Sequence, residues 1–143
     1  MSSLIRVLVV DDFKPWLTRV TEMLGSEPGV QIVGTALDGP EAIAQAQTLR
    51  PDLVLMDVGL PGMSGIEAAR QIISLIPDIK IIFVSLSMDP EIVQAAIAVG
   101  GRGYIVKPNG NSAFLFAIKA AVGRKRNVCR ELPDVDVPET MGT

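Results

Sequence analysis

Four short apolar runs, each followed by a polar or charged residue, constrain the fold of this chain most strongly. They cover residues 7–10, 53–56, 81–84 and 104–106. Runs without polar alternation are typical of strands that are buried on both faces, as in a parallel sheet. The residues that follow the runs are Asp11 and Asp12, Asp57, Ser85 and Lys107. We therefore expect these polar side chains at the carboxyl edge of a parallel sheet, where open sheets bind ligands.

Segments with helical spacing separate the apolar runs. We expect strands at residues 5–10, 30–34, 52–57, 80–85 and 104–107. We expect helices that begin near Pro15, Asp38, Ser64, Asp89 and Ser112, the last one ending near residue 122. Five strands alternating with five helices predict an α/β fold, with a parallel sheet covered by helices on both faces. The polar residue Gln31 places the second strand at an edge of the sheet.

Local signals support the predicted helix starts. Asp38 and Asp89 are each followed closely by proline, and residues 64–67 (Ser-Gly-Ile-Glu) form a capping box. The predicted buried stripes contain residues 16, 20, 23 and 24 in the first helix, 66, 69, 73 and 76 in the third, and 93, 96 and 97 in the fourth.

Composition narrows the class of protein. The 143 residues suit a single domain, and the net charge of −3 gives no sign of direct nucleic-acid binding. No apolar stretch reaches the roughly 20 residues that span a bilayer, and the N-terminal residues do not resemble a signal peptide. The lone cysteine, Cys129, fits a reducing compartment, so we expect a cytoplasmic protein. The absence of histidine excludes Ser-His-Asp and Cys-His catalysis and most zinc sites.

The polar residues at the strand ends suggest a site for a divalent cation and a phosphoryl group. Three carboxylates, a hydroxyl and an ammonium are suited to hold both. Structural alternatives exist for each residue. One residue of the Asp11-Asp12 doublet could cap the first helix, Asp57 could be a turn residue, Ser85 could be an ordinary strand end, and Lys107 could be a surface lysine.

The ordered set Asp11-Asp12, Asp57, Ser85 and Lys107-Pro108, with the segment 57–65, resembles the receiver domain of two-component response regulators. The resemblance covers about residues 4–123. It implies a flavodoxin-like (βα)5 fold with five parallel strands in the order 2-1-3-4-5. Residues 124–143 contain two prolines and no apolar periodicity, so we interpret them as a flexible tail or a truncated linker.

The resemblance also implies roles for individual residues. Asp57 would accept a phosphoryl group from a histidine kinase, and Mg²⁺ would be held by Asp11, Asp12, Asp57 and the backbone carbonyl of Gly59. Lys107 would neutralise a phosphoryl oxygen and Ser85 would donate a hydrogen bond to another. Ser85 and Tyr104 would form the switch pair, and the Lys107–Pro108 peptide bond would be cis.

The family further implies a signalling role without a reaction other than the domain's own phosphorylation and dephosphorylation. Phosphorylation would alter the face formed by the fourth helix, the fifth strand and the fifth helix. That face would bind an output domain, a target protein or a second copy of the chain, with no direct contact to nucleic acid or membrane. The segments 84–88 and 103–104 resemble receivers attached to helix-turn-helix output domains.

Three residues depart from the common receiver pattern. Gly59 replaces a larger polar residue, Leu86 a small one, and Phe13 a residue that is polar in some receivers. Leu86 keeps open the alternative of a scaffold with the receiver fold that is not phosphorylated. An enzyme of the haloacid-dehalogenase type is disfavoured because neither Asp11 nor Asp57 has an acid two residues later. A flavodoxin is disfavoured because the first strand–helix turn is acidic rather than glycine-rich.

Overall fold

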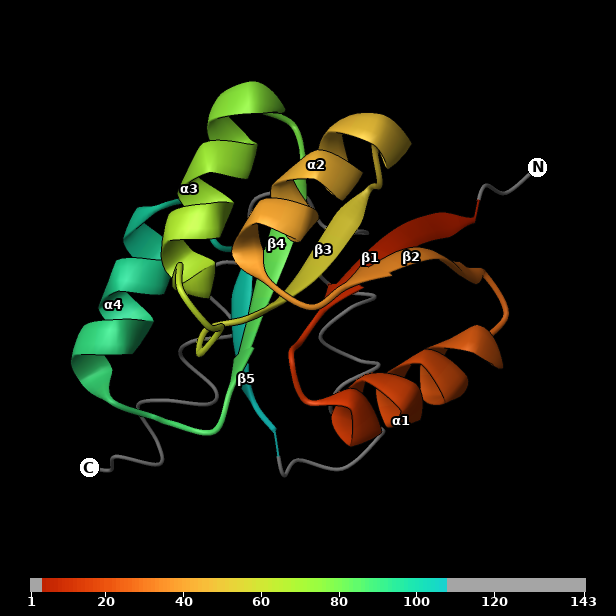
Figure 1. The fold of residues 1–143 in the computed structure, drawn as a ribbon, viewed down its shortest axis with the longest axis horizontal. Helices are drawn as coiled ribbons and strands as arrows, with labels where there is room; N and C mark the ends of the chain where they lie inside the picture. Colours follow the sequence, from red (N-terminus) through yellow and green to blue (C-terminus); the bar gives the residue numbers. More distant parts are fainter. Residues whose placement is uncertain (1–3, 108–143) are drawn as a thin grey trace.

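The structure, a computed structural model, describes residues 4–107, in which strands and helices alternate (Figure 1). The elements are β1 (Ile5–Val10), α1 (Lys14–Gly25), β2 (Val30–Ala36), α2 (Gly39–Leu49), β3 (Leu53–Asp57), α3 (Gly65–Leu75), β4 (Lys80–Ser85), α4 (Pro90–Ala98) and β5 (Gly103–Val106). The helix predicted at 112–122, the Lys107–Pro108 peptide bond and the segment 124–143 lie outside the described residues.

All five strands form one parallel sheet in the order β2-β1-β3-β4-β5. This confirms the predicted order and the edge position of the strand that contains Gln31. Val10 of β1 pairs with Met56 of β3, and Asp57 pairs with Val84 of β4. The carboxyl ends of β1, β3 and β4 therefore lie next to one another.

Side chains that alternate along the strands supply two separate hydrophobic cores. Leu8, Met56 and Phe83 face the helices α2, α3 and α4, whereas Val9, Leu55 and Ile82 face α1. Figure 1 shows α1 on one side of the sheet and α2, α3 and α4 on the other. Because the strands are covered on both faces, continuous apolar runs identified them.

The predicted caps of α2, α3 and α4 are confirmed. Asp38, Ser64 and Asp89 each accept a hydrogen bond from a backbone N–H in the first turn of the helix that follows. Only half of the predicted capping box forms as expected: Ser64 Oγ accepts from the Glu67 N–H at 3.2 Å, while the Glu67 carboxylate binds Arg70 and Gln71. Glu67 therefore stabilises the exposed side of α3 instead of its start.

Several details differ from the sequence prediction. β5 covers Gly103–Val106 and not 104–107, and in α1 Leu17 is buried while the predicted residues 16 and 23 are only partly buried. β2 continues to Ala36, beyond the predicted residue 34, because Gly34, Thr35 and Ala36 pair with β1 after an irregularity between Val7 and Leu8. In α3, Ala69 and Ile76 are buried as predicted, but the centre of the buried stripe also contains Ala68 and Ile72, while residues 66 and 73 are only partly buried. The buried face of α3 is thus centred on residues 68, 69, 72 and 76, so the predicted stripe lay partly to one side of it.

Candidate functional site

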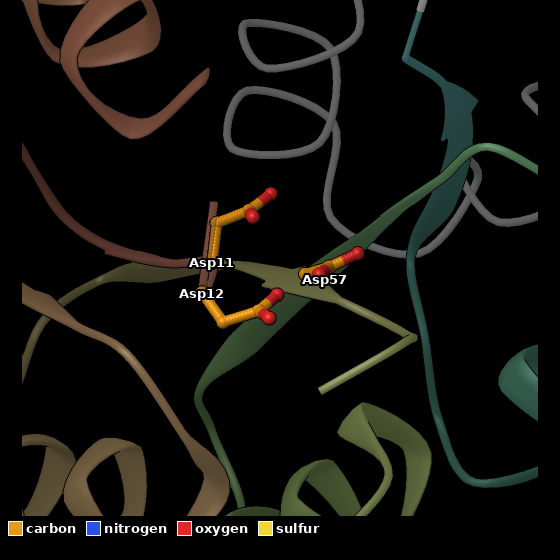
Figure 2. A group of neighbouring side chains, drawn as sticks. All are labelled: Asp11, Asp12 and Asp57. Carbon is orange, nitrogen blue, oxygen red and sulfur yellow. The ribbon is translucent and has the colours of Figure 1, made fainter. Parts of the chain in front are cut away.

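Five of the predicted site residues lie where a strand ends, whereas Gly59 lies in the loop after β3 and Tyr104 lies within β5. Asp11 and Asp12 directly follow β1, Asp57 is the last residue of β3, Ser85 is the last of β4, and Lys107 directly follows β5. The parallel sheet brings these ends to one edge, as the sequence predicted. Figure 2 shows the carboxylates of the doublet and of Asp57 close together at this edge.

The three aspartates form an acidic cluster. One carboxylate oxygen from each of Asp11, Asp12 and Asp57 lies within 4.8 Å of the others. The side chains of Asp11 and Asp57 are buried, with exposed fractions of 2% and 5%, whereas Asp12 is exposed. Asp12 therefore faces the side from which a ligand can enter, and the other two form the floor of the site.

The start of α1 does not explain the acidic doublet. The residue that caps α1 is Phe13, which makes no side-chain cap hydrogen bond. Asp11 Oδ1 accepts a hydrogen bond at 2.8 Å from the Phe13 N–H, which fixes the turn that leaves β1. This contact occupies one oxygen of one carboxylate, so helix capping leaves most of the acidic ligand atoms unused.

Lys107 lies between the two buried carboxylates. Its Nζ atom is 2.8 Å from Asp11 Oδ2 and 3.5 Å from Asp57 Oδ1. Asp11 Oδ2 is buried and its contact with the ammonium lacks hydrogen-bond geometry. The ion pair nevertheless neutralises this buried oxygen, so the atom already holds one cation at the site.

Burial and like charge act together on Asp57. The pKa of Asp57 is raised from its ordinary value of 3.8 to about 6. Burial is the largest cause and the neighbouring carboxylates of Asp11 and Asp12 add to it, while Lys107 and a backbone hydrogen bond from Gly59 lower the pKa. The ammonium alone therefore does not neutralise the cluster. An additional cation near these oxygens would favour the ionised form of Asp57.

Ser85 and Tyr104 meet at the backbone of Ser87. Ser85 Oγ accepts a hydrogen bond from the Ser87 N–H at 3.1 Å, and the Tyr104 hydroxyl donates to the Ser87 carbonyl oxygen at 2.7 Å. Tyr104 is fully buried, and burial raises the pKa of its hydroxyl. A side-chain hydrogen bond with Ser85 opposes this rise, so the Ser85 hydroxyl contacts both Ser87 and Tyr104.

A cleft of about 770 Å³ opens over Asp57, Ser85 and Lys107. Its rim includes the apolar side chains of Phe13 and Leu86, which are 59% and 75% exposed. Trp16 also lines the cleft, and Lys107 Nζ lies 5.6 Å from the centre of its ring. The sequence assigned Trp16 to the core only, because helical periodicity gives no information about a contact with a lysine 91 positions away.

The comparisons with known proteins identify the family. The family described as "Response regulator receiver domain" matches residues 7–119. The chain belongs to this family. This confirms the predicted family, the flavodoxin-like fold and the general role of a receiver in phosphorelay signalling.

Relatives with known names include larger regulators. The response regulator GacA of Pseudomonas viridiflava is 36% identical over 90% of this chain and 60% of its own length. The transcriptional regulatory protein LiaR of Bacillus subtilis is 36% identical over 82% of this chain and 56% of its own length. The chain thus spans about 60% or less of these relatives. Only the receiver part of each protein is compared.

Solved receiver structures have the same fold. The receiver domain of NarL from Mycobacterium tuberculosis matches with a TM-score of 0.82 and 27% identity, over 86% of this chain and 99% of that one. The response regulator domain of CheB from Thermotoga maritima gives 0.78 and 33%, over 84% and 97%. A complex named CheX-CheY-BeF3-Mg²⁺ from Borrelia burgdorferi matches with a TM-score of 0.77 and 28% identity, over 81% of this chain and 87% of that one.

Among residues 4–107, no helix has the length and hydropathy needed to cross a membrane.

Proposed function

We propose that this receiver accepts a phosphoryl group from a histidine kinase on the carboxylate of Asp57. The observation that carries this proposal is the position of Asp57. It is the buried carboxylate at the end of the central strand β3, beside the doublet and 3.5 Å from Lys107 Nζ. Asp57 also lines the cleft, so a donor has access to a carboxylate that is otherwise enclosed.

The residues present fit a Mg²⁺ ion. The ligands would be Asp11, Asp12, Asp57 and the carbonyl oxygen of Gly59, which form the all-oxygen set that Mg²⁺ prefers. The buried Asp11 Oδ2 already pairs with the positively charged Lys107 ammonium, which supports a role in holding a cation. When bound, Mg²⁺ would supply positive charge that offsets the carboxylates and the phosphoryl oxygens.

The side chains then have separate roles in the transfer. An oxygen of ionised Asp57 attacks the phosphorus, a new O–P bond forms, and the P–N bond of the donor phosphohistidine breaks, with its electron pair leaving on the imidazole. The Lys107 ammonium and the Ser85 hydroxyl bind phosphoryl oxygens, and both already line the cleft beside Asp57. Positioning and charge stabilisation suffice for this chemistry, so no histidine of the chain is required.

The signal would leave the site through Ser87. Ser85 and Tyr104 both hold the backbone of Ser87, which lies between β4 and α4. A shift of Ser85 toward a phosphoryl group would therefore be transmitted to α4 and β5. We propose that the face formed by α4 and β5 contacts an output domain, a target protein or a second copy of the chain.

We also propose that the domain spans residues 4–123. It would act in the cytoplasm, and its only chemistry would be its own phosphorylation and dephosphorylation.

Intact mass spectrometry tests the proposal. Prolonged incubation with phosphoramidate or acetyl phosphate and Mg²⁺ should add one phosphoryl group to the unmodified chain and none to Asp57→Asn. Asp78→Asn, an exposed position between α3 and β4, is the matched control and should be labelled like the unmodified chain. Equal labelling of Asp57→Asn would refute the assignment. Absence of labelling with every donor would favour the unphosphorylated scaffold.

A further inference from the structure

We propose that Trp16 is a positioning residue for Lys107, whose ring face holds the ammonium in the phosphoryl site. This inference rests on the proposed function of Asp57. Lys107 Nζ lies 5.6 Å from the centre of the Trp16 ring, within the range of a cation–π contact. The Lys107 side chain is only 11% exposed, and such contacts are stronger when water is excluded.

The fold fixes the Trp16 ring from the α1 side. α1 begins at Lys14, and in its first turn the backbone N–H of Trp16 donates to the Phe13 carbonyl oxygen at 3.1 Å. The next residue, Leu17, is buried in the core between α1 and the sheet. Trp16 itself is partly buried and packs against the same core, while it also lines the cleft with Lys107. The ring is therefore held by packing and does not depend on Lys107 for its position.

The ring provides an attraction that a carboxylate cannot provide. Lys107 Nζ is closer to Asp11, at 2.8 Å, than to Asp57, at 3.5 Å. Any cation that binds Asp11 competes with the ammonium for this oxygen, and the long lysine side chain then loses its strongest restraint. An aromatic face attracts the ammonium without adding a negative charge that would repel a phosphoryl group. Trp16 is thus the partner that Lys107 keeps while the aspartates and the phosphoryl oxygens exchange partners.

This role predicts a separation between two binding events. Loss of the ring should weaken the binding of a phosphoryl group, which uses Lys107. It should leave the affinity for Mg²⁺ nearly unchanged, because Trp16 supplies no metal ligand. A merely structural role of Trp16 would weaken both events together or would lower stability alone.

The test is a double-mutant cycle with beryllofluoride as the phosphoryl mimic. Its affinity is measured by ¹⁹F NMR in saturating Mg²⁺, because Trp16 is the sole tryptophan and its variants lose the fluorescence signal. Trp16→Leu should weaken beryllofluoride binding roughly five- to twentyfold, and Trp16→Phe by less. In a Lys107→Met background, Trp16→Leu should have no further effect. Glu22→Gln, at an exposed position of α1 that does not line the cleft, is the control and should bind normally.

The outcomes separate this inference from the proposed function. Equal effects of Trp16→Leu with and without Lys107, or equal effects of Trp16→Phe and Trp16→Leu, would overturn the role of Trp16. Failure of the unmodified chain to bind beryllofluoride would overturn the proposed function and the inference with it. If Trp16→Leu does not fold, the beryllofluoride affinities of the chains with Trp, Tyr and Phe at position 16 test the role of the ring instead. The affinity should fall in that order when Lys107 is present and stay constant in Lys107→Met.

Discussion

The Tyr104 hydroxyl donates a hydrogen bond to the carbonyl oxygen of Ser87 at 2.7 Å, and this contact ties β5 to the loop that precedes α4. The same loop contains a series of side-chain contacts. Ser85 Oγ accepts from the Ser87 N–H, Ser87 Oγ accepts from the Asp89 N–H, and Asp89 Oδ1 accepts from the Glu91 N–H. An unbroken set of hydrogen bonds thus leads from the phosphoryl site to the first turn of α4.

The first prediction concerns this contact. Tyr104→Phe removes the donor and leaves the Ser87 carbonyl without it, so the free energy of unfolding should fall by roughly 0.5–1.5 kcal/mol. Urea denaturation measures the loss. Ser87→Ala keeps the Tyr104 contact but removes the bond to the Asp89 N–H. It should therefore weaken the amide-exchange protection of the first turn of α4 more than that of β5. If both variants changed the amide-exchange protection of α4 and β5 equally, the hydrogen bonds of this loop would not connect the phosphoryl site specifically to α4.

The second prediction concerns pH and Asp57. Because the pKa of Asp57 is about 6 in the folded state against an ordinary value of 3.8, the folded protein binds more protons than the unfolded chain between these pH values. The contribution of Asp57 to stability is therefore fully present below about pH 3.8 and is lost as pH rises through about 6. As pH rises across this window, the free energy of unfolding of the metal-free protein should fall by roughly 1–3 kcal/mol relative to that of Asp57→Asn.

Denaturation in EDTA at a series of pH values measures this difference. At neutral pH without metal, Asp57→Asn should be the more stable protein, because the variant removes a buried charge next to two other carboxylates. Saturating Mg²⁺ should reduce the advantage. A difference that does not change with pH would show that Asp57 has the same pKa in the folded and unfolded states, which would contradict the raised pKa.

The third prediction concerns the metal. Asp12→Ala should remove most of the Mg²⁺-dependent change in Trp16 fluorescence, since Asp12 is the exposed ligand of the cluster. Lys107→Met should instead raise Mg²⁺ affinity about tenfold, equivalent to about 1.4 kcal/mol, because a positive charge 2.8 Å from Asp11 is removed. Fluorescence titration follows the first effect and calorimetric titration gives the Mg²⁺ affinity of both variants, with Asp78→Asn as the control. Unchanged affinity in Asp12→Ala would exclude Asp12 as a ligand.

The fourth prediction concerns the close approach of α3 to β3. A Cβ atom added at Gly65 would lie 1.9 Å from the Asp57 carbonyl oxygen, which leaves no room for a side chain. Gly65→Ala should therefore push the start of α3 away, lower the free energy of unfolding by roughly 1–3 kcal/mol and slow phosphorylation of Asp57. Gly25→Ala at the end of α1 meets no atom within 4 Å and is the matched control, expected to be neutral or slightly stabilising.

Much of the fold was predictable because the strands are buried on both faces, so that residues 7–10 and 53–56 stand out as apolar runs. The positions of Asp11, Asp57, Ser85 and Lys107 followed from the strand ends. The strand order came from the family resemblance, since apolar runs do not determine which strands are neighbours.

Contacts between distant residues were not predictable from local patterns. The Trp16–Lys107 contact and the Tyr104–Ser87 hydrogen bond join residues on different elements, and both depend on side-chain orientation. The extension of β2 past Gly34 was missed because a glycine interrupts an apolar pattern, although its backbone still pairs with Leu8.

The last prediction concerns the lifetime of phosphorylated Asp57. Hydrolysis needs a water molecule aligned behind the phosphorus, and the side chains placed to orient it are those at Phe13, Gly59 and Ser87. Phe13 is apolar, Gly59 has no side chain, and Ser87 Oγ already accepts a hydrogen bond from the Asp89 N–H. None of the three is a carboxylate or an amide. We therefore expect phosphoaspartate that forms slowly from small donors, because Leu86 lies at the rim of the cleft, and that decays slowly without a partner.

Two variants test the two halves of this expectation. A Cβ atom at Gly59 would meet no atom within 4 Å, so Gly59→Asn fits the site and should speed decay by placing an amide beside the phosphoryl group. Leu86→Ala should speed formation from acetyl phosphate by opening the rim. Both rates are followed by intact mass, with Gly25→Ala as the control. Decay within seconds in the unmodified chain would refute the argument. Rates that both variants leave unchanged would refute it as well, because Gly59 and Leu86 would then control neither the decay nor the formation of phosphorylated Asp57.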